Sequence, residues 1–147
     1  MKISTKGRYG LRALIDLSVH SDGKPVLLRD IAKRQEISRR YLERLFSSLK
    51  SIGVIRSVRG AQGGYVLARD PKAIRVSDIL EALEGPFIPV DCVGNQDVCQ
   101  QSDECVTRDI WCSIARQIKD YFDNMVLETL IEDYRRRHNM GVIDYQI

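Results

Sequence analysis

The chain has 147 residues, of which 44% are hydrophobic, and this is enough apolar material for one folded domain with an appendage. The net charge of +3 hides a division, because residues 1–69 carry fifteen Lys and Arg against five Asp and Glu, and the remainder carries eight against fifteen. A strongly basic half favours a polyanionic partner such as DNA. No run approaches the roughly 20 apolar residues of a membrane-spanning helix, so we expect a cytoplasmic protein without a membrane partner.

The first half of the chain has the periodicity of three helices followed by a hairpin. Apolar residues spaced three and four apart predict the helices, and two β-prone runs on either side of a glycine-rich turn predict the strands. The predicted helices cover residues 5–20, 28–35 and 38–51, and the predicted strands cover 54–58 and 65–68. Helices joined by a short turn and followed by a two-stranded ribbon predict a winged helix-turn-helix domain over residues 1–85.

The second half has a different organisation. Residues 86–106 form a cysteine-rich loop, residues 107–137 contain a long helix and a terminal helix over 127–134, and residues 138–147 form a tail. The long helix has an apolar seam at spacings of 3, 4, 4 and 3 that consists of Trp111, Ile114, Ile118, Phe122 and Met125. Such a seam predicts dimerisation through this helix, although it could instead pack on the protomer's own first helix. The predicted fold class is therefore mainly α with a small β-hairpin, a winged helix-turn-helix domain plus a long dimerisation helix.

The third predicted helix has the composition of a DNA-recognition helix. Its outward positions are polar and mostly cationic, and they are Arg39, Arg40, Glu43 and Arg44. In a major groove the arginines would contact guanine or phosphate, and Glu43 would accept a hydrogen bond from a cytosine amino group. A salt bridge from Glu43 to Arg39 or Arg40 within the helix is the alternative.

Further DNA contacts are expected from three hydroxyl groups and from the wing. Tyr9, Ser38 and Tyr41 would donate to phosphates, or else Ser38 only caps its helix and the two tyrosines pack. Arg59 would enter a narrow minor groove or contact a phosphate. The wing glycines, which would permit close approach to the DNA backbone, are Gly60, Gly63 and Gly64.

All four cysteines lie within residues 92–112, namely Cys92, Cys99, Cys105 and Cys112. In a reducing compartment such a group indicates metal binding rather than disulfides. The spacings are too open for the paired knuckles of zinc sites, whereas iron–sulfur clusters tolerate them. Cys92, Cys99 and Cys105 are the expected ligands. The fourth is either Cys112, which shares a helical face with Cys105, or an acid of the loop such as Asp103 or Glu104.

Four segments together resemble the IscR-type family of iron–sulfur winged-helix regulators, whose cluster-free branch comprises CymR-type repressors. The segments are Lys2-Ile3-Ser4-Thr5-Lys6-Gly7-Arg8-Tyr9, Ile37-Ser38-x-x-Tyr41-Leu42-Glu43-x-Leu45-Phe46, Ser57-Val58-Arg59-Gly60-x-x-Gly63-Gly64-Tyr65 and Cys92-x6-Cys99-x5-Cys105-x-Thr107. The resemblance implies a homodimeric transcription factor with no enzyme activity. It would bind double-stranded DNA at a near-palindromic operator, carry a loop cluster, usually [2Fe-2S], and control iron–sulfur assembly or stress genes.

The chain also departs from this family pattern. IscR-type regulators have a histidine three residues after the third cysteine, where this chain has Arg108. Some family members take a carboxylate from near the start of the partner's first helix, where this chain has Arg8. The alternative function is therefore a cluster-free, CymR-like repressor of cysteine and sulfur metabolism. A thiol oxidoreductase or electron carrier is a third possibility, but it has no Cys-x-x-Cys motif to support it.

Overall fold

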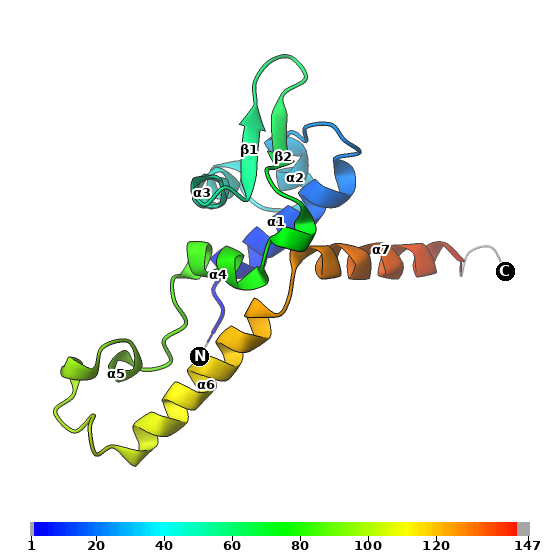
Figure 1. Cartoon of the computed structure of the whole chain (residues 1–147). Helices are drawn as coiled ribbons and strands as arrows, with labels where there is room; N and C mark the ends of the chain where they lie inside the picture. Colours follow the sequence, from blue (N-terminus) through cyan, green and yellow to red (C-terminus); the bar gives the residue numbers. More distant parts are fainter. Residues whose placement is uncertain (1, 144–147) are drawn as a thin grey trace.

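The computed structural model describes residues 2–143, and its first half is a three-helix unit (Figure 1). The helices are α1 (Thr5–His20), α2 (Leu28–Gln35) and α3 (Arg39–Ser51). Local chemistry sets their ends. The Ser4 side chain accepts a hydrogen bond from the Lys6 backbone N–H at the start of α1, and Glu36 ends α2 in the left-handed conformation at φ 55°.

A two-stranded wing follows α3. Strands β1 (Ile55–Val58) and β2 (Gly64–Leu67) pair antiparallel, and Val26 adds a single-residue bridge to Tyr65 on the other edge of β2. The rings of Tyr65 and Phe46 of α3 pack edge to face, with ring centroids 5.1 Å apart. The wing is therefore attached to the helical unit by backbone hydrogen bonds and by packing, and the predicted fold class, mainly α with a small β-hairpin in a winged helix-turn-helix domain, is confirmed.

The hydrophobic core lies between α1, α2, α3 and the base of the wing. Its largest fully buried side chains from these elements are Leu14, Leu17, Ile31, Leu42, Phe46, Leu49 and Ile55. The core also takes in α4 (Val76–Glu84), which follows a short 3-10 turn, η1 (Pro71–Ala73). Gly10 of α1 allows close packing there, because a Cβ at Gly10 would lie 2.2 Å from Leu83 of α4.

The cysteine loop and the long helix extend away from the wing (Figure 1). The loop contains two short turns of helix, α5 (Asp91–Gly94) and η2 (Gln96–Val98), and then α6 (Val106–Asp123) begins. No residue of α6 is fully buried. The helix contacts the body of the protein through α4, and much of its apolar surface is left exposed in the protomer.

The terminal helix α7 (Leu127–Ile143) is longer than the sequence predicted. The expected end at Tyr134 is wrong, because the helix continues through residue 143, and only residues 144–147 of the predicted tail lie outside the described part. The His138 ring stacks on Tyr134 one turn earlier at 3.8 Å, and its Nδ1 lies 2.8 Å from the Tyr134 carbonyl oxygen. Leu127 and Ile131 are buried in the main core, so α7 is anchored there at its start.

Candidate nucleic-acid interface and cysteine loop

Helix α3 presents its predicted DNA-contacting side to solvent. Ser38 caps the helix, since its Oγ accepts the Tyr41 backbone N–H at 3.1 Å, which leaves the hydroxyl hydrogen free to donate. Leu42 and Phe46 on one face of α3 are buried in the core, so the opposite face of the helix is exposed to solvent. The exposed residues of that face are Arg39, Arg40, Glu43 and Arg44.

The Glu43 carboxylate is engaged in the ion pair that the sequence offered as an alternative. Its Oε1 lies 3.3 Å from Arg39 Nε, and the Glu43 side chain is 51% exposed. An exposed helix pair of this kind contributes only about 0–1 kcal/mol. Glu43 can therefore leave Arg39 at little cost, and its role as a base reader stays a prediction.

Tyr9 and Tyr41 pack against each other where α1 and α3 begin. Their rings meet edge to face at 6.2 Å, both side chains are half-buried, and the Tyr41 hydroxyl lies 2.9 Å from Thr5 Oγ1. The guanidinium groups of Arg12 and Arg44 lie 5.5 and 5.7 Å from the centres of the Tyr9 and Tyr41 rings respectively. The packing expected as the alternative is thus present, and the two rings hold the start of α1 against the start of α3.

Sequence reasoning missed two residues at this corner, Thr5 and Arg12. Besides lying over Tyr9, Arg12 donates from Nε to the Gln35 side-chain oxygen at 3.1 Å and from its terminal nitrogen to the Gln35 carbonyl at 3.0 Å. The spacing of Thr5, Tyr9 and Arg12 places them on one face of the helix, and this spacing could have indicated from the sequence that they act together.

Contacts within the protein, which the sequence did not indicate, explain why glycine occupies two of the wing positions. A Cβ at Gly63 would lie 2.3 Å from the Val58 carbonyl oxygen, and one at Gly64 would lie 2.4 Å from the Val26 carbonyl oxygen. Gly60 adopts φ 110° in open space. Two of the three glycines are therefore required by contacts within the protein, while Arg59 and Gly60 lie exposed at the turn.

The cysteine loop places its thiols on separate elements. Cys92 belongs to α5, Cys99 follows η2 and is exposed, Cys105 is the N-cap of α6, and Cys112 lies within α6. All four are free thiols. Across residues 2–143, no three His, Cys, Asp or Glu side chains are close enough together to hold a metal ion.

Arg108 occupies the position of the family's histidine and contacts the backbone. Its Nε donates to the Cys92 carbonyl oxygen at 3.0 Å, so the first turn of α6 is tied to α5. This bond brings the chain segments that carry Cys92 and Cys105 together. The guanidinium cannot take the ligand role of a histidine, since its nitrogens are hydrogen-bond donors and offer no lone pair to a metal.

The chemistry of the loop fits an iron–sulfur cluster, although its described geometry is not assembled. The Thr107 hydroxyl lies 3.2 Å from Cys105 Sγ and lowers the pKa of this thiol, and the Arg108 backbone N–H lowers it further. A lowered pKa favours the thiolate that binds iron. Ser102, between Cys99 and Cys105, has a buried hydroxyl with no hydrogen-bond partner in the described structure, so it is available to donate to a group held by the loop.

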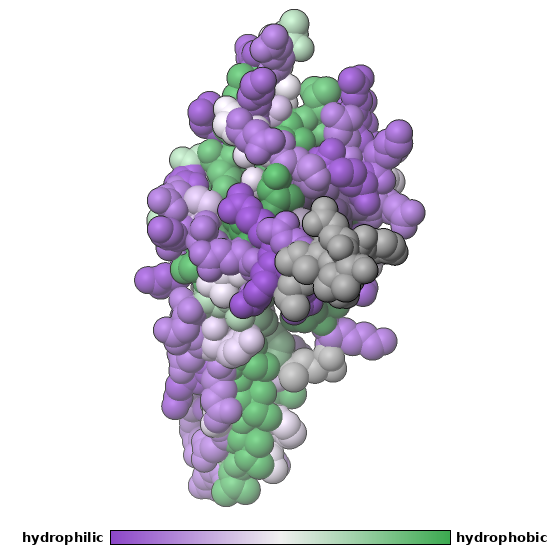
Figure 2. Space-filling view, turned by 90° about the vertical axis from the view of Figure 1, so that its right-hand side faces the viewer, coloured by the Kyte–Doolittle hydropathy of each residue, from purple (hydrophilic) through white to green (hydrophobic). Residues whose placement is uncertain are grey.

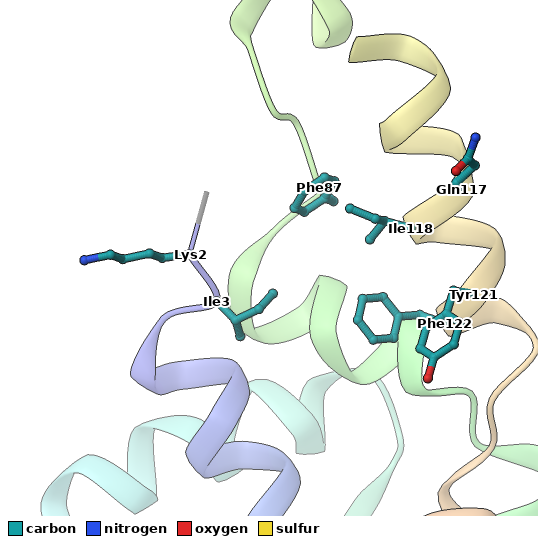
Figure 3. Close-up of a pocket in the computed structure, with 7 residues that line it drawn as sticks. All are labelled: Lys2, Ile3, Phe87, Gln117, Ile118, Tyr121 and Phe122. Atoms are coloured by element: carbon teal, nitrogen blue, oxygen red, sulfur yellow. The ribbon is translucent and has the colours of Figure 1, made fainter. Parts of the chain in front are cut away.

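An apolar groove runs beside α6. It has a volume of about 530 Å³ and lies between α4, residues 85–89 and α6. A neighbouring cavity of about 330 Å³ is lined by Ile3, Phe87, Ile118 and Phe122 (Figure 3).

In Figure 2, apolar residues form a stripe down the lower half of the molecule. The exposed large apolar and aromatic side chains of α6 are Val106, Ile110, Trp111 and Tyr121.

No helix in the described part of the chain, residues 2–143, is both long enough and apolar enough to cross a bilayer.

Comparison with known proteins gives one consistent result. The model of the Rrf2 family, described as an iron-dependent transcriptional regulator, matches residues 3–133. The chain is 39% identical to the HTH-type transcriptional regulator IscR of Vibrio campbellii over 133 residues, 90% of this chain and 79% of the relative. It is 42% identical to the HTH-type transcriptional regulator CymR of Bacillus subtilis over 130 residues, 88% of this chain and 89% of the relative. The solved structure of T. potens IscR superposes with a TM-score of 0.74 at 39% identity, covering 91% of this chain and 88% of that one.

Proposed function

Because the chain belongs to the Rrf2 family of transcriptional regulators, we propose that it is a cytoplasmic homodimer whose operator binding is modulated by an iron–sulfur cluster. The cluster, a [2Fe-2S] centre, would be held by Cys92, Cys99 and Cys105, and the regulated genes would serve iron–sulfur assembly or stress responses. No catalysis is assigned to it. The observation that carries the proposal is the gathering of every cysteine of the chain within residues 92–112, in the loop and the start of the long helix, all as free thiols.

DNA binding is supported by the charge and shape of the winged domain. Residues 1–69 have a net charge of +10, from fifteen basic and five acidic residues, so a dimer would bring two such surfaces to one duplex. Two-fold symmetry of the protein favours a near-palindromic operator. Phosphate contacts would fix the register, and the α3 side chains with Arg59 would select the sequence.

Dimerisation is supported by the apolar surface of α6. At about 100° per residue, its apolar side chains occupy roughly half of the helix circumference. Ile118 and Phe122 face the body of the protomer, whereas Ile110 is 53% exposed and Tyr121 is 63% exposed. A second α6, related by a two-fold axis, would cover the exposed half of this surface.

The cluster would supply a group whose presence and redox state follow iron supply and oxidants. The chain's own residues determine how it is held. Arg108 keeps α5 against α6 through the Cys92 carbonyl, and Thr107 favours the thiolate of Cys105. The fourth ligand would be Cys112 or an acid of the loop, Asp103 or Glu104, because Arg108 is excluded.

A cluster-free repressor of cysteine and sulfur metabolism is the second candidate function. It is favoured by the 42% identity to CymR and by the absence of an assembled donor group within residues 2–143. In that case the half-buried Cys105, with its lowered pKa, would respond to oxidants directly.

Anaerobic purification followed by iron and sulfide analysis tests the proposal. The wild-type protein should be brown, with charge-transfer absorption and equal amounts of iron and acid-labile sulfide. Single replacement of Cys92, Cys99 or Cys105 by Ala should remove the iron while circular dichroism shows an intact helical fold. A colourless wild-type protein, or full iron content in all three variants, would replace this proposal with the cluster-free one.

Replacement of Cys112 by Ala identifies the fourth ligand in the same measurement. Loss of the absorption bands would assign the position to Cys112. Retention of the full spectrum and iron content would exclude Cys112 and point to Asp103 or Glu104, each then replaced by Ala in turn.

A further inference from the structure

Glu84, the last residue of α4, is hydrogen-bonded to the start of α1. Its Oε1 accepts hydrogen bonds from the Ser4 hydroxyl at 2.7 Å and from the Gly7 backbone N–H at 2.8 Å. A Cβ at Gly7 would lie 2.7 Å from this oxygen, so glycine allows the helix backbone to reach it. A carboxylate is favourable here because the N-terminal end of a helix carries partial positive charge.

On its other side, Glu84 is directly connected to the cysteine loop. Gly85 caps α4 at φ 83°, and the chain continues through Pro86 and Pro89 before reaching Cys92. Between the prolines, Phe87 faces the same cavity as Ile3 of the N-terminal segment (Figure 3). The entry of the loop is thus adjacent to the N-terminal segment at two points, one polar and one apolar.

The same N-terminal segment contacts the recognition helix. Thr5, between Ser4 and Gly7, has its hydroxyl 2.9 Å from the hydroxyl of Tyr41 on α3. The Tyr41 backbone N–H donates to Ser38, the cap of that helix, at 3.1 Å. Residues 4–7 therefore have α4 on one side and the first turn of α3 on the other.

Cluster binding requires the loop to change shape. Within residues 2–143 no three donor side chains converge, so holding a cluster means drawing Cys92, Cys99 and Cys105 together. Only residues 85–91 separate Glu84 from Cys92, and Pro86 and Pro89 each fix one φ angle of this short connection, so a displacement of the loop can reach the end of α4.

We propose that Glu84 is a positioning residue that transmits the state of the cysteine loop to recognition helix α3 through its contacts with Ser4 and Gly7. This inference rests on the proposed cluster-dependent regulation. The two states of the protein are the one with the contracted loop and the one with the open loop. They differ in the position of α3 relative to α1. The measured quantity is the ratio of operator affinities between the cluster-loaded and the cluster-free protein.

Glu84→Gln tests the proposal, because the amide has the same shape but loses the charge that holds two donors. Fluorescence anisotropy with a labelled operator duplex gives the affinity ratio for each protein at one salt concentration. The ratio should fall at least about fivefold toward unity in Glu84→Gln, since coupling between sites in proteins is typically 5–150-fold. Iron content should stay that of the wild type, because Glu84 is not a ligand.

Glu81→Gln is the matched control. It removes the same charge from an exposed position one turn earlier on α4, which lines the same groove but forms no hydrogen bond with Ser4 or Gly7, and should keep the wild-type ratio. Thr5→Val removes the next contact and should lower the ratio as Glu84→Gln does, and the double variant should show no additional loss. Thr5→Val also tests the proposal if Glu84→Gln folds poorly.

The outcomes separate this proposal from the function on which it rests. A wild-type ratio of one would mean that the cluster does not modulate binding, and the proposed function would fail. If the wild-type ratio differs from one and Glu84→Gln keeps the same ratio, the role of Glu84 alone is contradicted. The same holds if Glu81→Gln lowers the ratio as much as Glu84→Gln does.

Discussion

At the scale of single residues, Asp16 holds the helix-turn-helix to α1. Its side chain is 1% exposed, and its carboxylate accepts hydrogen bonds from Arg34 at 2.6–3.1 Å and from the Gln35 amide at 2.8 Å. The hydrogen bonding to Asp16 raises the pKa of Arg34 above its ordinary value. The pair joins α1 to the end of α2, just before the turn that leads to α3.

Asp16→Asn should destabilise the protein by about 3 kcal/mol, the lower end of the range for a broken buried ion pair. The lower end applies because the Arg34 side chain is 35% exposed. Urea unfolding at a fixed protein concentration, with an unchanged m-value, measures the loss. Asp22→Asn in the exposed turn after α1 is the control and should stay within about 0.5 kcal/mol. Equal midpoints for both variants would contradict this account.

Glu43→Ala should relax base preference more than it lowers affinity for the preferred site. The carboxylate forms only a weak exposed ion pair with Arg39, so its loss leaves the fold unchanged, while each base contact discriminates by about 1–3 kcal/mol. Selection from a randomised operator library reads out the preference, with Glu36→Ala, outside α3, as the control. Unaltered base preferences in Glu43→Ala would rule out the reader role.

At the scale of elements, the wing depends on its junction with the segment before α2. The Val26 N–H donates to the Tyr65 carbonyl at 2.9 Å, and the Tyr65 N–H donates back to Val26 at 2.8 Å. Gly64 precedes this junction at φ 147° and packs directly on Val26. This residue pair and this glycine therefore help to set the position of the wing relative to the helices, together with the packing of Tyr65 on Phe46.

Gly64→Ala should lower both thermal stability and operator affinity, because the added methyl group collides with the Val26 backbone and forces β2 away. Gly60→Ala is the control, since it also has a positive φ but has no atom within 4 Å of its added Cβ. Gly60→Ala should cost only backbone strain, about 1–3 kcal/mol, and Gly64→Ala clearly more. Differential scanning calorimetry ranks the two, and the reverse order would refute the explanation.

At the scale of the whole molecule, the winged domain is a closed unit whereas α6 is not. Helix α7 returns to the main core through Leu127 and Ile131, and its first residue is bonded to the segment between η1 and α4, where the Leu127 N–H donates to the Ile74 carbonyl at 2.9 Å. Helix α6 lies between these anchored elements, with its first half and the cysteine loop extending away (Figure 1). The proposed dimer would cover this part.

Ile110→Asp should give monomers at micromolar concentration, because a second α6 would otherwise bury an unpaired carboxylate. Ile110 is 53% exposed in the protomer, so the substitution should leave the monomer folded. Arg116→Asp introduces the same carboxylate at an exposed position about 120° from Ile110 around α6 and should remain dimeric. Sedimentation velocity distinguishes the two, and a dimeric Ile110→Asp would exclude dimerisation through this surface.

The elements of the winged domain were predictable from the sequence because their signals are local. Ser38 caps α3, and Leu42, Leu45 and Leu49 recur at spacings that define one face, so both features depend on residues within a few positions of each other. The clustering of the cysteines was visible for the same reason. The end of α7 was missed because an i to i+4 contact between Tyr134 and His138 continues a helix whose amphipathic pattern has already faded.

The connections between these elements were decided by the tertiary structure. Glu84 meets Ser4 across 80 positions of sequence, and Arg108 meets the Cys92 carbonyl across 16. Gly64 is required by Val26, a residue from before α2. No periodicity encodes such pairs, since they form only when packing of the apolar faces brings distant backbone and side-chain groups together. Local patterns therefore determined which elements exist, and packing determined which residues can act on one another.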